Sequence, residues 1–81
     1  MFKVGDRVRV VKEFCQNKTC LQKIGTIANI ANKSFGVYDV EFDFGFPNGH
    51  NGSNGRCRDG CTWTYTGDCL ELVSVFEVDL L

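Results

Sequence analysis

The residues best suited to chemistry are five cysteines, at positions 15, 20, 57, 61 and 69. Four of them form two pairs in the sequence, Cys15 with Cys20 and Cys57 with Cys61, and four thiolates could hold a tetrahedral zinc ion. The spacings are looser than those of common zinc sites, so free thiols are the favoured state. Disulfides are an alternative, although a cytoplasmic location disfavours them and an odd number of thiols leaves one over. We therefore expect no cofactor and no metal, with zinc the least favoured of the three states.

The single histidine, His50, lies in a segment that contains three Asn-Gly steps. It has no Cys, Asp or Ser partner at a recognised catalytic spacing, and we interpret it as a solvated loop histidine. A phosphate-binding loop would need a strand-to-helix context and a Gly-Lys-Ser/Thr ending, which this segment lacks. Asparagine and glycine tolerate positive φ, so the repeated steps predict turns. No motif names a reaction, and we expect a protein that is not an enzyme.

Aromatic and arginine side chains near the same segment are the best candidates for binding a partner. Arg56 and Arg58 precede Trp63 and Tyr65, and Phe14 stands in an earlier polar connection. Side chains of these types dominate the energetics of protein interfaces. The simplest prediction places the rings of Trp63 and Tyr65 in the core. The alternative places one ring at the rim beside Phe14, where it would bind a protein or stack on bases.

An acidic row offers a second candidate surface. Asp39, Glu41 and Asp43 alternate with apolar residues, so they are expected on one face of a strand. The ordinary interpretation is the solvated face of that strand. Such a row would also fit a basic partner surface or imitate nucleic acid.

A basic row near the N-terminus is the best support for nucleic-acid or nucleotide binding. The net charge of −1 gives no overall electrostatic attraction to nucleic acid, so the support comes only from this cluster of basic residues. The row consists of Lys3, Arg7, Arg9 and Lys12.

Two alternating segments, 37–44 and 61–65, must position these side chains, with a glycine-rich loop at 45–60 between them. Further strands are expected at 4–11, about 25–30 and 70–73, with a polar connection at 12–23, a turn at 31–34, and a tight turn or one turn of 3₁₀ helix at 66–68. Short strands without a convincing helix predict an all-β fold. We expect a small five-stranded barrel with an enlarged hairpin loop, because closure removes exposed sheet edges.

The length of 81 residues leaves room for one small domain, 1–81, with a C-terminal extension at 74–81. The first residues become charged too soon for a signal peptide, and no apolar run reaches the length of a membrane helix. We expect a cytoplasmic protein with no membrane partner. The extension continues the apolar alternation of the last strand, so the expected state is a monomer or a weak homodimer through this tail.

Four short motifs follow one another in an order that resembles small SH3-like barrels. They are Val4-Gly5-Asp6-Arg7-Val8-Arg9-Val10, Ile24-Gly25-Thr26-Ile27, Tyr38-Asp39-Val40-Glu41-Phe42 and Leu70-Glu71-Leu72-Val73. The pattern resembles the KOW and Mind-bomb-repeat type, as in small uncharacterised bacteriophage proteins, and it covers most of residues 3–73. Two features depart from such barrels: the acidic-aromatic signature of proline-peptide-binding SH3 domains is absent, and the loop at 45–60 is longer than the usual hairpin.

The resemblance implies a binding protein, since barrels of this type bind nucleic acids, peptides and proteins. We expect a non-enzymatic protein-binding module, a phage or mobile-element protein that binds or inhibits a host protein. Inserted loops on a rigid scaffold often carry individual function, so the loop-bearing side is the expected site. The alternatives are a KOW-like barrel that binds nucleic acid or nucleotides, a nucleic-acid mimic, and a structural role through self-association.

Overall fold

The computed structural model describes residues 2–13 and 19–73, whose five antiparallel strands form one sheet in the order β4-β3-β2-β1-β5. The strands are β1 (Arg7–Val10), β2 (Ile24–Asn32), β3 (Val37–Glu41), β4 (Thr62–Thr66) and β5 (Leu70–Leu72). A 3₁₀ turn, η1 (Gly67–Cys69), joins β4 to β5. The first four strands form a meander, and β5 returns to pair with β1. The prediction of an all-β fold is confirmed, and so is the 3₁₀ turn.

Strand β1 lies between β2 and β5, and its side chains alternate between the core and the outer surface. Val8 and Val10 are fully buried, whereas Arg7 and Arg9 on the opposite face are only partly buried. This strand pairs with β2 on one side and with β5 on the other. A strand of four residues can therefore supply apolar contacts to the core and charged groups to the outer surface.

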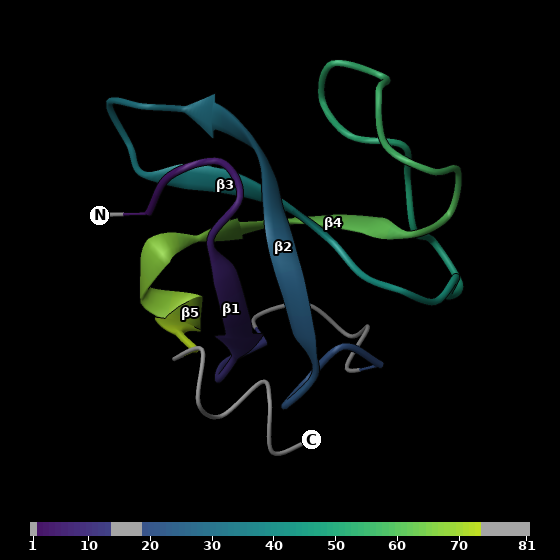
Figure 1. Cartoon of the computed structure of the whole chain (residues 1–81), viewed down its shortest axis with the longest axis horizontal. Helices are drawn as coiled ribbons and strands as arrows, with labels where there is room; N and C mark the ends of the chain where they lie inside the picture. The colour runs from purple at the N-terminus through teal and green to yellow at the C-terminus, as the bar shows by residue number, and fades with distance from the viewer. Residues whose placement is uncertain (1, 14–18, 74–81) are drawn as a thin grey trace.

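Strand β2 bends the sheet around its core. Two register shifts interrupt its pairing with β3, and such bulges increase the local twist. Near the start of β2, Gly25 permits close contact with β3, because a Cβ atom there would lie 2.6 Å from Val40 Cγ1 and 2.8 Å from the carbonyl oxygen of Glu41. Figure 1 shows the result: β2 runs across the front of the molecule, and β4 crosses behind it at a large angle.

The coiled sheet encloses one hydrophobic cluster, to which all five strands contribute. Partly buried Phe2, Leu21, Ile30, Phe44 and Trp63 pack against its surface. The hydrogen-bonded sheet of the described residues is open, with β4 and β5 at its edges. The cluster consists of Val8, Val10, Cys20, Ile27, Tyr38, Val40, Phe42, Phe46, Tyr65, Cys69 and Leu70.

All five strands lie where the sequence predicts them, but several begin or end at other residues than expected. The strand expected at 37–44 ends at Glu41, where the backbone bends toward the loop, although Phe44 still packs against the core. The tail at 74–81, Phe14 and Cys15 lie outside the described residues. Within the described part, no helix is long and apolar enough to cross a membrane.

Candidate functional site

The long loop, residues 42–61, leaves the sheet through a hydrogen-bonded stem. The amide of Phe42 donates to the carbonyl of Cys61 at 2.9 Å. Farther along the loop, His50 and Thr62 exchange two backbone hydrogen bonds of 2.9 and 3.0 Å. In Figure 1 the loop is the large teal and green excursion at the right, beyond the ends of β3 and β4. The stem fixes where the loop starts, and side chains fix where it lies.

A buried carboxylate holds the loop against the outer face of the sheet. Asp39 is 0% exposed, with Asn29 of β2 and Thr64 of β4 paired beside it. Its oxygens accept hydrogen bonds from Thr64 Oγ1 (2.7 Å), Ser53 N (2.7 Å), Ser53 Oγ (3.0 Å) and Asn29 Nδ2 (3.1 Å). We call these four residues the Asp39 anchor. Since Ser53 belongs to the loop and the others to the sheet, the anchor fastens the loop to three strands.

The charge state of the anchor follows from its surroundings. Burial by itself raises the pKa of Asp39, but hydrogen bonds from Thr64, Ser53 and Asn29 outweigh burial and leave the pKa below its ordinary value. The carboxylate is therefore ionised at neutral pH. A buried ion is tolerated here because each donor stabilises the charged form.

His50 extends the anchor into the loop. Its Nε2 lies 3.1 Å from Thr64 Oγ1, and its Nδ1 accepts a hydrogen bond of 2.9 Å from the amide of Gly52. The ring is half-buried, with its centroid 6.0 Å from that of Trp63. The interpretation of His50 as a solvated loop histidine is wrong, because the loop folds back and supplies partners for both ring nitrogens.

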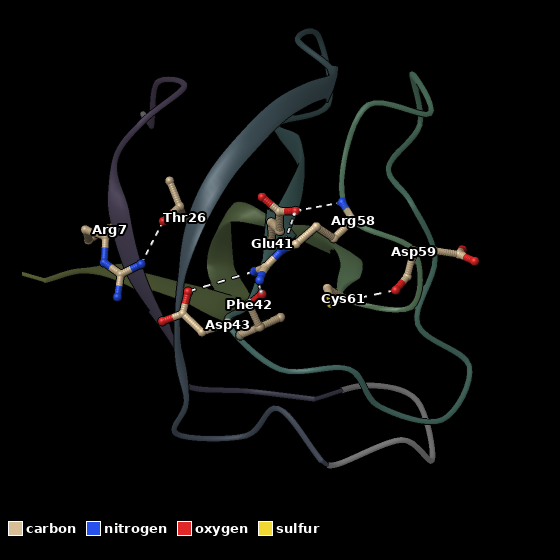
Figure 2. A network of polar contacts seen from close by, with 8 residues as sticks. All are labelled: Arg7, Thr26, Glu41, Phe42, Asp43, Arg58, Asp59 and Cys61. Atoms are coloured by element: carbon tan, nitrogen blue, oxygen red, sulfur yellow. Dashed lines mark hydrogen bonds and ion pairs between the residues drawn. The ribbon is translucent and has the colours of Figure 1, made fainter.

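A second contact to the sheet is made at the surface by Arg58. Its backbone amide donates to Glu41 Oε2 at 2.8 Å, and its Nη2 donates to the carbonyl of Phe42 at 2.5 Å. Figure 2 shows the guanidinium reaching over the end of β3, where Asp43 Oδ1 lies 4.0 Å away. The Arg58 side chain is 59% exposed, so these contacts weigh less than those of the anchor.

An aromatic cluster lies between the stem and the core. The ring centroids of Phe42, Phe44 and Phe46 lie 5.5–5.9 Å apart, and that of Trp63 lies 6.2 Å from Phe46. Trp63 and Phe44 are half-buried, so part of each residue is open to solvent. The rings give the loop an apolar base beneath its polar tip.

The two rings expected at the site have different surroundings. Tyr65 is 4% exposed, and its hydroxyl donates to Glu13 Oε2 at 2.8 Å. Burial raises the pKa of Tyr65 far above its ordinary value, and the hydrogen bond to Glu13 adds to the effect. Trp63 is half-buried and packs against the core cluster, so part of the residue is open to solvent. The neighbour that the rim alternative gave it, Phe14, lies outside the described residues. Tyr65 therefore belongs to the core rather than to a binding surface.

The expected arginines also differ in their availability. Arg56 is exposed at the loop tip, where its backbone amide is held by Asn54 Oδ1 at 3.1 Å. Arg58 is engaged with Glu41 and the end of β3, as described above. The structure thus places Arg56, Arg58 and Trp63 on the loop and its base, whereas Phe14 lies outside the described residues.

The acidic row is not a row in the structure. Asp39 is buried under the loop, Glu41 is bound by Arg58, and the side chain of Asp43 is 84% exposed beyond the end of β3. The prediction of a shared solvated face is wrong, because the long loop covers the outer face of β3.

Two side chains of the basic row already have partners within the protein. Arg9 forms a 2.6 Å ion pair with Glu71, and Arg7 donates a hydrogen bond to Thr26.

The cysteines do not assemble into a site within the described part of the protein. Cys57, Cys61 and Cys69 are free thiols, and Cys20 is buried in the core. No group of three or more His, Cys, Asp or Glu side chains among residues 2–13 and 19–73 could hold a metal ion. Of the four cysteines in the zinc hypothesis, Cys20, Cys57 and Cys61 therefore do not form a metal-binding group, and Cys15 lies outside the described residues.

Sequence reasoning missed the anchor partners and one exposed ring. An aspartate in the middle of a strand is disfavoured, and this was the available signal that Asp39 has a special environment. Phe35, at the turn between β2 and β3, is 80% exposed, but nothing in the alternation separates it from core aromatics. No protein-family model and no curated protein matches the sequence. The resemblance to SH3-like barrels therefore stays a prediction.

Proposed function

We propose that the protein is a non-enzymatic protein-binding module whose partner contacts the tip of the long loop. The observation that carries this proposal is an exposed tip with an ordered backbone. Residues 53–56 are exposed, yet the amide of Cys57 donates to Asn51 at 2.9 Å and that of Gly55 to Gly52 at 3.0 Å. With Ser53 fastened to Asp39, the tip loses little conformational entropy when a partner binds.

The chemistry of the tip favours a protein partner. Arg56 supplies an exposed guanidinium, and Trp63 supplies a half-buried ring at the base of the loop. A protein of this size offers little area, so affinity must come from a few arginine and aromatic side chains. Arg58 contributes mainly by holding the loop, because its guanidinium is already bound to the sheet.

We also propose that the sheet is an SH3-like barrel and that the partner is a host-cell protein met in the cytoplasm. The meander of four strands, the return of β5 beside β1 and the shared core support the fold. The host partner rests on the resemblance to small bacteriophage proteins. Fold alone does not select a function, so the loop carries the weight of the proposal.

Comparative affinity capture tests the proposed surface. Wild-type protein, Arg56→Ala and Phe35→Ala are immobilised and incubated with a bacterial lysate, and bound proteins are quantified by mass spectrometry. We expect one lysate protein to be captured equally by wild type and Phe35→Ala. Much less of the same protein should be captured by Arg56→Ala. With the purified partner, Arg56→Ala should weaken binding by about 1–3 kcal/mol. Equal retention by all three proteins would move the site away from the loop.

A gel-shift assay distinguishes the alternative of nucleic-acid binding. Because the ion pair with Glu71 offsets the charge of Arg9, we expect no shift of single- or double-stranded DNA or RNA at low salt. Binding that weakens steeply with salt would instead assign the function to the basic row. A matching loss on replacing Lys3 and Lys12 by alanine would locate the contact.

A further inference from the structure

The three Asn-Gly steps of the long loop differ in what their glycine amides contact. The amide of Gly49 donates to the carbonyl of Phe46, and that of Gly55 donates to the carbonyl of Gly52, both at 3.0 Å. The amide of Gly52 instead donates to His50 Nδ1 at 2.9 Å. A carbonyl oxygen cannot remove the amide proton at neutral pH, whereas a neutral imidazole is a base. The steps are Asn48-Gly49, Asn51-Gly52 and Asn54-Gly55.

The hydrogen bonds also determine the tautomer of His50. A backbone amide can only donate, so Nδ1 is the unprotonated nitrogen and Nε2 carries the proton. Nε2 then donates to Thr64 Oγ1 at 3.1 Å, and Thr64 donates to Asp39 Oδ1 at 2.7 Å. A buried carboxylate therefore orients the imidazole through one hydroxyl, with the basic nitrogen directed at Gly52. This resembles the way a carboxylate orients a catalytic histidine.

We propose that Asn51-Gly52 is a self-modification site at which His50 acts as the general base. His50 Nδ1 takes the amide proton of Gly52, and the amide nitrogen attacks Cγ of the Asn51 side chain. The bond between Cγ and Nδ2 of Asn51 breaks and ammonia leaves with the proton returned by His50, so a cyclic succinimide remains. Water then opens either carbonyl of the ring and gives aspartate or isoaspartate. No oxidant or cofactor is needed.

The three asparagines also differ in what restrains them, and the comparison again favours Asn51-Gly52. Asn51 is exposed, and no hydrogen bond to another described residue holds its side chain. Asn54 Oδ1 is held by the amide of Arg56 at 3.1 Å. Asn48 has a φ of 68°, a left-handed conformation fixed by the turn at the loop base. Asn51 alone combines an unheld side chain with a base on the following amide.

Peptide-level mass spectrometry of the aged, folded protein tests the proposal. Wild-type protein is incubated at neutral pH, digested, and the mass gain of deamidation is measured separately at each asparagine, with isoaspartate detected by enzymatic methylation. We expect Asn51 to react faster than Asn48 and Asn54. In denaturant, where the base is no longer positioned, the three rates should become similar. Equal rates in the folded protein would overturn the proposal.

Two variants separate general-base catalysis from loop loosening. His50→Gln removes the base, and we expect the rate at Asn51 to fall roughly 10-fold or more. Loosening of the loop would raise the rates at all three steps, so the two effects have opposite signs. Thr64→Val should slow Asn51 by removing the orienting hydroxyl, and Thr64→Ser should restore the rate. An unchanged or faster reaction at Asn51 in His50→Gln would refute the role of His50.

Discussion

On the inner face of β3, Tyr38 and Val40 pack into the hydrophobic core, whereas on the outer face Asp39 lies under the long loop. Both faces exclude water. The inner side chains belong to an apolar cluster to which every strand contributes, while the carboxylate accepts hydrogen bonds from donors on β2, β4 and the loop. One strand thus serves as part of a core and as the attachment point of the long loop.

The difference between the two faces lies in how their contacts are shared. Apolar burial is non-directional, so many neighbours contribute and a modest change can be absorbed by repacking. Hydrogen bonds to a carboxylate are directional, and all four bonds of the Asp39 anchor end on one residue. The sheet should therefore lose stability gradually when inner residues change, whereas the position of the loop depends on Asp39.

The largest expected effect is on the inner face. Phe42→Ala would leave a cavity where Phe44 and Phe46 now pack, and should reduce the free energy of unfolding by about 3–5 kcal/mol. Chemical denaturation monitored by tryptophan fluorescence measures the change. Phe35→Ala is the control, since its ring is 80% exposed and its replacement should alter stability by no more than about 0.5 kcal/mol.

Asp39→Ala should produce the next largest effect, and a local one. It leaves the donors of Thr64 and Ser53 without their acceptor, which should cost about 2–3 kcal/mol. Hydrogen exchange should show the amides of Ser53 and Gly52 losing protection while those of β1 and β2 keep theirs. Asp43→Ala removes an exposed carboxylate and serves as the control. A uniform loss of protection across the sheet would contradict the separation of the two faces.

Acid should reproduce the outer-face effect without mutation. The pKa of Asp39 is lowered in the folded state, so its contribution to stability is present above the unfolded pKa of about 3.9 and is lost as pH falls toward the folded value. Denaturation midpoints measured from neutral to acidic pH should fall in that window. Asp39→Asn should flatten this part of the profile, and an unchanged acid limb would assign it to other carboxyl groups.

Arg58→Ala should give the smallest effect. The side chain is largely exposed, and its contacts with Glu41 and Phe42 hold the loop only near the end of β3, so the loss should not exceed about 1 kcal/mol. Thermal unfolding at low and high salt measures it, since screening should reduce the difference between variant and wild type. If Arg58→Ala lowered the free energy of unfolding as much as Asp39→Ala, the exposed Arg58 contacts would matter as much as the buried Asp39 anchor.

The alternation of apolar and polar residues predicted β1, β3 and β4 because it records which side chains share a face of a strand. It contains no information on what covers that face. Asp39 looked solvated because its cover comes from Ser53, on a loop whose path is set by contacts distant in sequence. The same loop path gives His50 its two hydrogen-bond partners, and no pattern in the sequence indicates them.

The pairing of β1 with β5 has a consequence for the order in which the native structure opens. β5 has three residues, and the ion pair that crosses from β1 to β5 joins Arg9 to Glu71 across 62 positions of the sequence. β5 lies at an edge of the described sheet, and a strand of three residues forms few contacts that oppose its opening. We expect the amides of β5 to exchange with solvent through a partial opening, while the hairpin of β3 and β4 stays closed until global unfolding.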